Sequence, residues 1–342
     1  MIDVLMIVKN EYEGVQVTLN SLVKFNFPGR VFILDTGSTD GTQEIVKSFQ
    51  NLSVFVAEDE FKNFAQARNA AQNWVLKEFP DVEHVLWLDA NDEISGAVPI
   101  VNSDAVHVCQ EWSGSTRFFN LRIFRLQPNT IWHGYVHEWI ELPPHFKTVK
   151  WDFETFVIRQ DRSKNCQSSE KRWRRDIEML HDQIKENPRD SRYYFYLGRT
   201  YKDIGDDENA KKYFRQRLDF SDFKEERFWA KQFIAEIEKT DPMLFMDAFE
   251  ECGRIEPLLC AAQIYIDQHK WHLAFMCCFT ATQYDLPKDC VLFINVDDYE
   301  YKRWHLLGIV AYYVGMMKIG KEACIKAGRD IDLKNLKWYV GR

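Results

Sequence analysis

The apolar residues of the first 160 positions occur in short runs that alternate with helical patterns. Four runs have the length and composition of buried strands, at residues 3–8, 31–35, 54–57 and 85–89. Between the last two, residues 64–76 place Phe64, Ala67, Ala71 and Trp74 on one helical face. This alternation predicts an α/β domain whose mostly parallel sheet is flanked by helices on both faces. Sheets of this kind bind ligands beyond the carboxyl ends of their strands.

After Ser168 the strand pattern stops, and long, charged, aromatic-rich helical patterns follow. We therefore expect an α/β domain over residues 1–165 and an all-α domain over residues 166–342. One string in the second half has the spacing of a tetratricopeptide helix pair, a repeat of about 34 residues. Its characteristic positions are Tyr194, Leu197, Gly198, Tyr201, Ala210 and Phe214. A weaker copy includes Ala262, Tyr265, Ala274 and Ala281, and a degenerate one spans residues 304–327.

Composition narrows the classes of function. A net charge of −8 without a basic run opposes binding to nucleic acid. The eight cysteines form no CxxC pair, which favours reduced and mostly buried thiols. The start, MIDVLMIV, lacks a basic region and is typical of a first strand instead of a signal peptide. The longest later apolar stretch, residues 306–317, is shorter than the roughly 20 residues that span a bilayer. We expect a cytoplasmic protein without a transmembrane segment.

Polar clusters follow the predicted strands. VKNEY begins at Val8, and its Asn10 and Glu11 could contact a nucleoside, although polar loops are common after strands. DTGSTDGT begins at Asp35 and includes Ser38. A capped turn explains most of this second string, but it does not explain an acidic residue at the end of an apolar strand. A carboxylate at that place can accept hydrogen bonds from a base N–H or from ribose hydroxyls.

Two further clusters carry charge. Arg68 of FAQARNAA is either an exposed surface residue or a forked donor for a diphosphate. VLWLDANDE ends an apolar run with several oxygen ligands, among them Asp89, Asn91 and Asp92. Such ligands suit a hard cation such as Mg²⁺ or Mn²⁺, while solvated turn acids are the simpler alternative.

Taken together, these strings resemble the family-2 glycosyltransferases with the GT-A fold, in particular those joined to tetratricopeptide repeats. The KNE loop, the DTGSTDGT turn, the ARN helix and the WLDANDE motif occur here in the family's order. A later feature of the family is an arginine-rich strand followed by a His-Glu pair. LRIFR at residues 121–125, followed by His137 and Glu138, resembles this feature. One departure is Asn91, which stands where the family's metal motif usually has its second aspartate. An amide oxygen brings no charge, so this change predicts weaker metal binding or a different ligand set.

The resemblance implies roles for particular residues. Asp35 would contact the base, Arg68 the diphosphate, and Asp89 with its neighbours the metal ion. The expected nucleotide-sugar site comprises Val8, Asn10, Glu11, Asp35, Ser38, Arg68, Asp89 and Ala90. The expected ligands of Mn²⁺ or Mg²⁺ are Asp89, Asn91, Asp92 and His137, with His133 a less favoured alternative to the last.

We expect an inverting transfer from a nucleotide-diphosphate sugar, with a UDP-sugar favoured, to a glycan or a protein or peptide acceptor. Glu138 is the best candidate for the catalytic base and Asp92 the second catalytic candidate. Trp132, Tyr135 and Trp139 could stack on a sugar ring, but core packing is the commoner fate of such residues.

Other functions stay open on the sequence. A sugar-nucleotide pyrophosphorylase would need a GxGTR-type first loop, which is absent. A scaffold with an inactive first domain is compatible with Asn91. The helical domain could bind a protein or peptide acceptor, shape the acceptor cleft or form a homodimer, and the sequence does not choose among these roles.

Overall fold

The structure is a computed structural model that describes residues 2–97, 100–112, 116–152, 155–160 and 166–339. The chain forms two compact units, Met1–Gln183 and Ile184–Arg342. The division falls inside helix α4 (Cys166–Glu186), whereas the change in sequence pattern places the domain boundary at the start of this helix. None of the described helices is long and apolar enough to cross a membrane.

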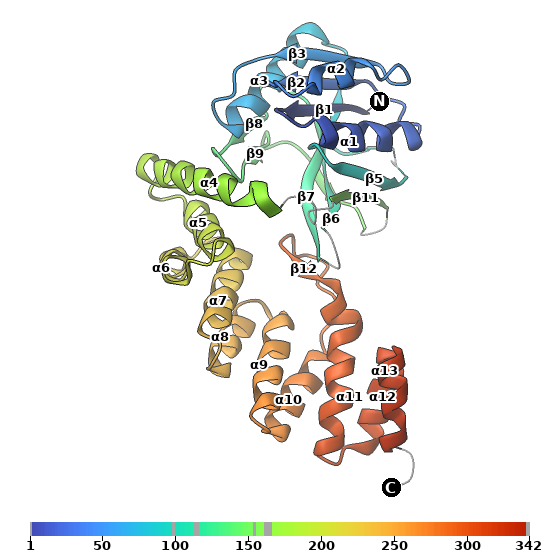
Figure 1. Cartoon of the computed structure of the whole chain (residues 1–342), viewed down its shortest axis with the longest axis vertical. Helices are drawn as coiled ribbons and strands as arrows, with labels where there is room; N and C mark the ends of the chain where they lie inside the picture. The colour runs from blue at the N-terminus through green and yellow to red at the C-terminus, as the bar shows by residue number, and fades with distance from the viewer. Residues whose placement is uncertain (1, 98–99, 113–115, 153–154, 161–165, 340–342) are drawn as a thin grey trace. The chain divides into compact units, whose positions relative to one another are not determined.

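The first unit is built on a mixed sheet whose leading strands are parallel (Figure 1). Strands β1 (Ile2–Val8), β2 (Val31–Asp35), β3 (Val54–Glu58) and β4 (His84–Trp87) pair in parallel in the order β3-β2-β1-β4. All residues of β2 and β4 are buried, as expected for strands that are covered on both faces. The apolar runs in the sequence therefore predicted these strands, with small differences at their ends.

The sheet continues with strands that the apolar runs did not predict, although the family resemblance indicated an arginine-rich strand at residues 121–125. β7 (Thr116–Arg125) lies antiparallel to β4 and to β6 (Ala105–Trp112), and the path ends with β11 (Phe156–Gln160) and β5 (Asp92–Gly96). The short strand β10 (Thr148–Lys150) also pairs with β6. Strands β8 (Ile131–His133) and β9 (Trp139–Glu141) form a separate antiparallel ribbon. This arrangement places β7 directly beside β4, which is important for the site.

Helices cover the sheet on both faces. Residues of α1 (Tyr12–Lys24) and α2 (Thr42–Lys47) pack with Val4, Met6 and Val8 of β1 in one apolar cluster. Residues of α3 (Phe64–Glu78) pack with Leu5 and Trp87 in a second cluster. Because successive residues of a strand point to opposite faces, β1 contributes to both clusters. The α/β class predicted from the sequence is confirmed.

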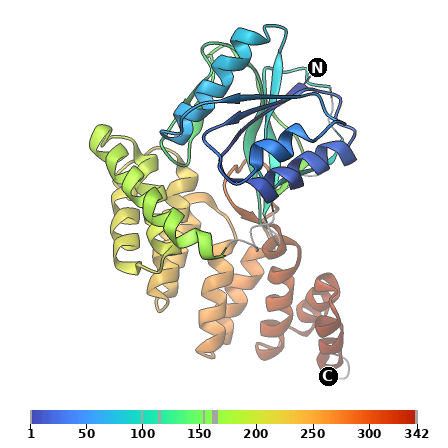
Figure 2. The same ribbon diagram turned by 45° about the horizontal axis from the view of Figure 1, so that its top comes forward.

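The second unit consists mainly of antiparallel helix pairs (Figure 2). Helices α5 (Ser191–Asp203) and α6 (Asp207–Leu218) form the first predicted pair, in which the Gly198 backbone lies against the Phe214 ring. A Cβ atom at Gly198 would lie 2.7 Å from that ring, so the glycine allows the close approach. The helices of the other two predicted pairs are α9 (Glu256–Asp267) with α10 (Trp271–Ala281), and α11 (Arg303–Tyr313) with α12 (Met317–Ala327). The remaining elements are α7 (Lys224–Glu238), α8 (Pro242–Cys252), β12 (Ile294–Asn295), the π-helical turn Asp298–Lys302, α13 (Asp330–Asn335) and the 3₁₀ turn Leu336–Tyr339.

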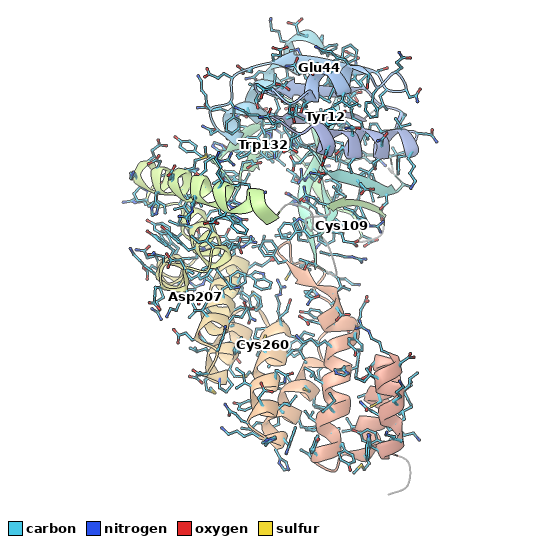
Figure 3. The ribbon with its side chains drawn as sticks, in the orientation of Figure 1. Tyr12, Glu44, Cys109, Trp132, Asp207 and Cys260 are labelled. Atoms are coloured by element: carbon cyan, nitrogen blue, oxygen red, sulfur yellow. The ribbon has the colours of Figure 1, made fainter. Side chains whose placement is uncertain are left out.

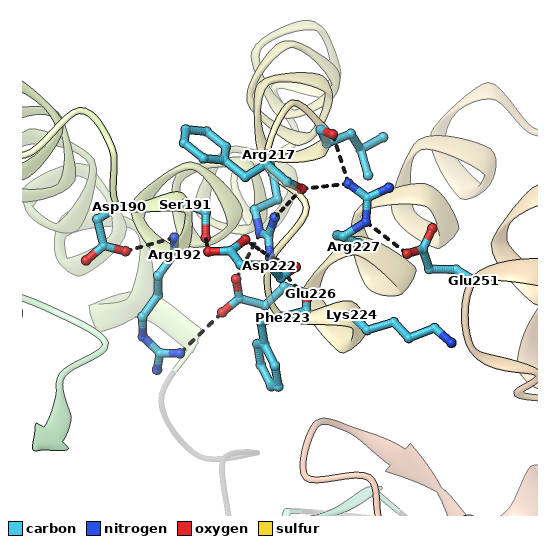
Figure 4. A network of polar contacts seen from close by, with 12 residues as sticks. Asp190, Ser191, Arg192, Arg217, Asp222, Phe223, Lys224, Glu226, Arg227 and Glu251 are labelled. Atoms are coloured by element: carbon cyan, nitrogen blue, oxygen red, sulfur yellow. Dashed lines mark hydrogen bonds and ion pairs between the residues drawn. The ribbon is translucent and has the colours of Figure 1, made fainter. Parts of the chain in front are cut away.

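A buried charge network fixes the turn between α6 and α7 (Figure 4). The fully buried Arg217 donates to Glu226 at 3.0 Å and to the backbone oxygens of Asp222 and Phe223, each at 3.1 Å. Arg192 pairs with the second oxygen of Glu226 at 3.2 Å. Arg227 donates to the Phe220 carbonyl at 2.6 Å, so two guanidinium groups satisfy carbonyl groups of the turn and stabilise its geometry inside the helical unit.

Candidate functional site

The loops after β1 and β2 are joined by hydrogen bonds. The Asn10 amide N–H donates to Ser38 Oγ at 2.9 Å, and Asn10 Oδ1 accepts from the Thr39 amide at 2.7 Å. The Tyr12 amide donates to Asp40 Oδ2 at 3.1 Å. The two motifs that the sequence singled out, VKNEY and DTGSTDGT, therefore form one surface at the carboxyl edge of the parallel strands.

Asp35 ends β2 and organises the second loop. Its Oδ1 atom accepts from the amides of Gly37 and Ser38, both at 2.8 Å. Its Oδ2 atom is buried and has no hydrogen-bond partner among the described residues. Val8 lies opposite Asp35 on β1, and its carbonyl accepts from Thr36. A buried acceptor without a partner is costly, so this oxygen is suited to an N–H or O–H donor of a ligand.

Arg68 of α3 is the centre of the site, and it is not the surface residue that was one option from the sequence. Only 6% of Arg68 is exposed. Its Nε donates to Glu138 at 2.6 Å, and its Nη2 donates to Asp89 Oδ1 at 3.0 Å and also contacts Glu138. The guanidinium carbon lies 4.7 Å from the ring centroid of Trp87 and 4.8 Å from that of Trp132. Two aromatic rings and two carboxylates thus hold one arginine in place.

Asp89 is bound by a second arginine as well. Arg122 of β7 donates to Asp89 Oδ2 at 2.9 Å and to Gln110 at 3.2 Å. Burial alone would raise the pKa of Asp89, but the charges and hydrogen bonds of Arg122 and Arg68 outweigh it and hold the pKa well below its ordinary value. Asp89 is consequently an ionised carboxylate with an arginine on each oxygen.

Asp92 and Asn91 lie in the turn after Asp89. Asp92 is fully buried, and it accepts from the Asp89 amide at 2.8 Å and from Gln160 at 3.3 Å. Burial raises the pKa of Asp92 to about 7 despite the nearby Arg122. This environment favours a structural role, in which Asp92 stabilises the turn. It does not favour direct contact of Asp92 with an acceptor. Asn91 has a left-handed backbone with φ of 72°, and its amide N–H donates to the Gly14 carbonyl at 3.1 Å.

Gly14 leaves space for two side chains of this cluster. A Cβ atom at Gly14 would lie 2.9 Å from both Asn91 Nδ2 and Glu11 Oε2. Burial raises the pKa of Glu11, and the negative charges of Asp40 and Asp89 raise it further. Glu11, Asn91 and Asp89 are thus neighbours, as their expected nucleotide and metal roles require.

The His-Glu pair lies just before β9. Glu138 points to Arg68, whereas His137 is exposed and has a left-handed backbone with φ of 52°. The His133 Nε2–H group donates to the Glu141 carboxylate at 2.8 Å, and the His133 ring stacks on Trp139 with ring centroids 4.6 Å apart. These contacts place His133 in the ribbon of β8 and β9.

The three aromatic candidates for sugar stacking differ in exposure. Trp132, which is labelled in Figure 3, is buried and donates to Gln72 at 2.9 Å, so it belongs to the core. Trp139 is 38% exposed, and Tyr135 is partly buried. Trp139 and Tyr135 therefore stay candidates for sugar stacking, and Trp132 does not.

The expected metal ligands do not form a ready-made cation site. Both Asp89 oxygens accept from arginines, and the Asp92 carboxylate is buried within the turn. Within the part of the chain that the structure describes, no group of three or more His, Cys, Asp or Glu side chains is placed to hold a metal ion. Binding of Mn²⁺ or Mg²⁺ by Asp89, Asn91, Asp92 and His137 stays a prediction.

Arg122 and Gln110 are site residues to which sequence reasoning gave no role. Arg122 was noted only as part of an arginine-rich strand, yet it is 6% exposed between buried apolar neighbours. A charge within an apolar strand is a signal in itself, because such a group needs a buried partner. The partner could not be identified without the pairing of β7 beside β4.

An α/β sheet with loops, carboxylates and arginines gathered at its carboxyl edge has the arrangement in which α/β domains bind ligands. Residues 3–98 match the model of Glycosyl transferase family 2. The chain thus carries a family-2 glycosyltransferase domain at its N-terminus.

Two curated relatives bear glycosyltransferase names. The SPbeta prophage-derived glycosyltransferase SunS of Bacillus subtilis (strain 168) is 24% identical over 235 residues, which are 65% of this chain and 54% of SunS. Glycosyltransferase SunS of Bacillus phage SPbeta matches with the same identity and coverage. The chain therefore spans about half the length of the curated relatives that it matches.

A solved structure matches more weakly. TTC0263, a thermophilic TPR protein of Thermus thermophilus, is 14% identical with a TM-score of 0.30, over 50% of this chain and 91% of that one. The helix pairs seen in this chain, and not that likeness, define its helical unit.

Proposed function

We propose that this chain is a glycosyltransferase that moves a sugar from a nucleoside-diphosphate sugar to a glycan or to a protein or peptide acceptor. The observation that carries the proposal is the cluster in which Arg68 joins Asp89 to Glu138 beside the Asp35 loop. These residues come from separate segments of the chain, and their carboxylates suit different tasks in sugar transfer. The glycosyltransferase names of the matched relatives support the same class of reaction.

The nucleotide is proposed to bind on the joined loops after β1 and β2. The buried Asp35 Oδ2 atom would accept from the base, with Val8, Asn10, Glu11 and Ser38 around it. Asp89 and Ala90 would line the sugar-diphosphate side, and a direct contact of Arg68 with the diphosphate belongs to the same proposal. UDP is the favoured nucleotide, and the N3–H group of its uracil ring could donate to the Asp35 carboxylate; guanine and thymine also carry such a group, which is why GDP- and dTDP-sugars are compared below.

Transfer is proposed to proceed with inversion and with Glu138 as the base. The acceptor oxygen forms a bond to the anomeric carbon as the bond from that carbon to the diphosphate oxygen breaks, and the nucleoside diphosphate leaves with the electron pair. The acceptor hydroxyl proton passes to the Glu138 carboxylate. The contact of Arg68 with Glu138 keeps this carboxylate oriented toward the cluster.

Metal dependence is a separate prediction, and no step above depends on it. A divalent ion would neutralise charge on the diphosphate when bound. Titration of UDP into the chain with Mn²⁺, with Mg²⁺ and with EDTA tests this prediction. Equal affinity in all three solutions would contradict it.

A transfer assay tests the function. The full chain would be incubated with UDP-, GDP- and dTDP-sugars and with glycan and peptide acceptors, and release of the nucleoside diphosphate measured. We expect Glu138→Gln to bind the donor but to lose about 100-fold or more in transfer rate. Glu141→Gln is the matched control, because Glu141 lies in the same ribbon but pairs with His133. Donor binding without turnover by the wild type would favour a scaffold with an inactive domain, and absence of nucleotide binding would contradict the proposal altogether.

Location and assembly are further parts of the proposal. A cytosolic setting is supported by the seven cysteines whose thiols are described, all of which are free. The helical unit would bind a protein or peptide acceptor or form a homodimer. Light scattering of the full chain, with and without acceptor, separates these two roles.

A further inference from the structure

The positive charges at the centre of the site are already matched by carboxylates. Arg68 and Arg122 pair with Asp89 and Glu138, and Arg122 also lies 4.0 Å from Asp92. Glu11 and Asp40 add negative charge beside this cluster, since both Asp40 and Asp89 raise the pKa of Glu11. A diphosphate carries negative charge of its own, and binding it among carboxylates requires further positive groups.

One face of α4 supplies positive groups at this place. The Arg175 guanidinium lies 5.6 Å from the ring centroid of Phe64, the first residue of α3. Arg172 precedes Arg175 by three residues and Asp176 by four, so it lies on the same face of the helix. Asp176 is buried, with 8% exposed. This face of α4 therefore lies against the first unit near the start of α3.

The Phe64 amide donates to the Tyr135 carbonyl at 3.2 Å, three residues before Glu138, so the face of α4 that carries Arg175 and Arg172 lies beside the segment of Glu138. Two electrostatic effects agree with this position of Arg172. Its positive charge opposes the rise in the pKa of Glu11 that burial and the neighbouring carboxylates produce. Burial raises the pKa of Asp176, and both Arg172 and Glu138 are close enough to act on it. Both effects are consistent with Arg172 on the face of α4 that lies against the start of α3.

Arg172 differs from the neighbouring arginines, because it has no ion-pair partner among the described residues. Arg174 pairs with Glu170 at 2.8 Å, and Arg175 pairs with Asp176 at 3.2 Å. Arg172 is exposed and makes no hydrogen bond or ion pair within the described ranges of the chain. An exposed arginine beside buried carboxylates, with its forked donors free, is suited to bind an anion that approaches the site.

We propose that Arg172 binds the diphosphate of the nucleotide-sugar donor from α4, as a positive group beyond the paired arginines at the centre of the site. This inference rests on the proposed function. It assigns to α4, the helix between the sheet and the helical repeats in sequence, a direct part in donor binding. Arg172 would also stabilise the negative charge on the departing nucleoside diphosphate.

Calorimetric titration of the full chain tests the assignment. The first probe is the nucleoside diphosphate that the wild type binds best among UDP, GDP, CDP and ADP. The second probe is the corresponding nucleoside. Each probe is titrated in EDTA and in Mn²⁺. We expect Arg172→Gln to weaken diphosphate binding about 10-fold or more and to change nucleoside binding less than 2-fold. Arg172→Lys should restore part of the loss. Arg174→Gln is the matched control, because it removes an exposed arginine from the same helix on a different face.

The results of these titrations distinguish failure of the Arg172 assignment from failure of the proposed function. Unchanged diphosphate affinity in Arg172→Gln overturns the Arg172 assignment and leaves the proposed function intact. Equal losses for diphosphate and nucleoside also overturn it, because they indicate a general structural effect. A wild type that binds no nucleoside diphosphate overturns the proposed function together with this assignment. Circular dichroism of each variant checks that the helices are retained.

Discussion

Asp92 makes the stability of the first unit depend on pH. Asp92→Asn should remove the part of this dependence that Asp92 causes. The carboxyl group has a pKa of about 7 in the folded chain, mainly because of burial, against an ordinary value of 3.8. Between these values the folded chain binds a proton that the unfolded chain does not, so stability falls as the pH rises toward 7. At about 1.4 kcal/mol per pH unit, the wild type loses about 3 kcal/mol between pH 5 and pH 8.

Asp92→Asn keeps an oxygen that can accept from the Asp89 amide. Its new N–H group replaces the oxygen that accepts from Gln160 Nε2, so the Gln160 amide has to turn over and present its own oxygen to keep that hydrogen bond. The new amide side chain does not titrate, so this contribution should vanish. We compare the free energy of unfolding of the variant with that of the wild type at each pH. Between pH 5 and pH 8 this difference should change by about 3 kcal/mol in favour of the variant. Other titrating groups, such as the buried His84 and the partly buried His107, are common to both proteins and cancel in the comparison.

Hydrogen exchange of the full chain, followed by mass spectrometry on peptides from β1 and β4, measures this difference within the first unit. Asp81→Asn is the control, because the Asp81 side chain is 69% exposed and should give a constant difference. A difference between Asp92→Asn and the wild type that stays constant within about 0.5 kcal/mol over this range would refute the reasoning.

Three further predictions concern the ion pairs of Arg68 and the close contacts of two glycines. Arg68→Met should lower the free energy of unfolding by about 3–5 kcal/mol, because it leaves two carboxylates without one arginine; a loss below about 1 kcal/mol in urea unfolding would show that these ion pairs matter little. Gly198→Ala should destabilise the helical unit by about 1–3 kcal/mol, since the added methyl group lies 2.7 Å from the Phe214 ring; an unchanged melting temperature would contradict this. Gly14→Ala should displace Asn91 and Glu11 and weaken UDP binding by calorimetry, while the melting temperature changes by only a few degrees. Retained UDP affinity in this variant would count against a role of those two side chains.

The parts of the fold that local patterns encode could be predicted from the sequence. The parallel strands are apolar runs because both faces of the sheet are covered, and the helix pairs have small residues such as Gly198 where the helices approach. The positions of Asp35 and Asp89 at strand ends follow from the same runs. These features depend only on neighbouring positions in the chain.

The partners of the site residues could not be predicted, because they depend on pairing between distant segments. The sequence gives no register for β7 beside β4, and this register brings Arg122 to Asp89. It also does not show that Trp132 packs against Arg68 in the core, or that Asp92 points inward. An aromatic or acidic residue in a polar motif has the same appearance in sequence whether it is exposed or buried.

The hydrogen bonds between the loops after β1 and β2 constrain how nucleotide preference can change. Asn10 contacts Ser38 and Thr39, and Tyr12 contacts Asp40, so a substitution in either loop alters the support of the other. Altering specificity for the base by changing one loop alone should therefore mostly yield damaged proteins. Homologues with a different base preference are expected to differ in both loops together, and libraries for redesign should vary the two segments jointly.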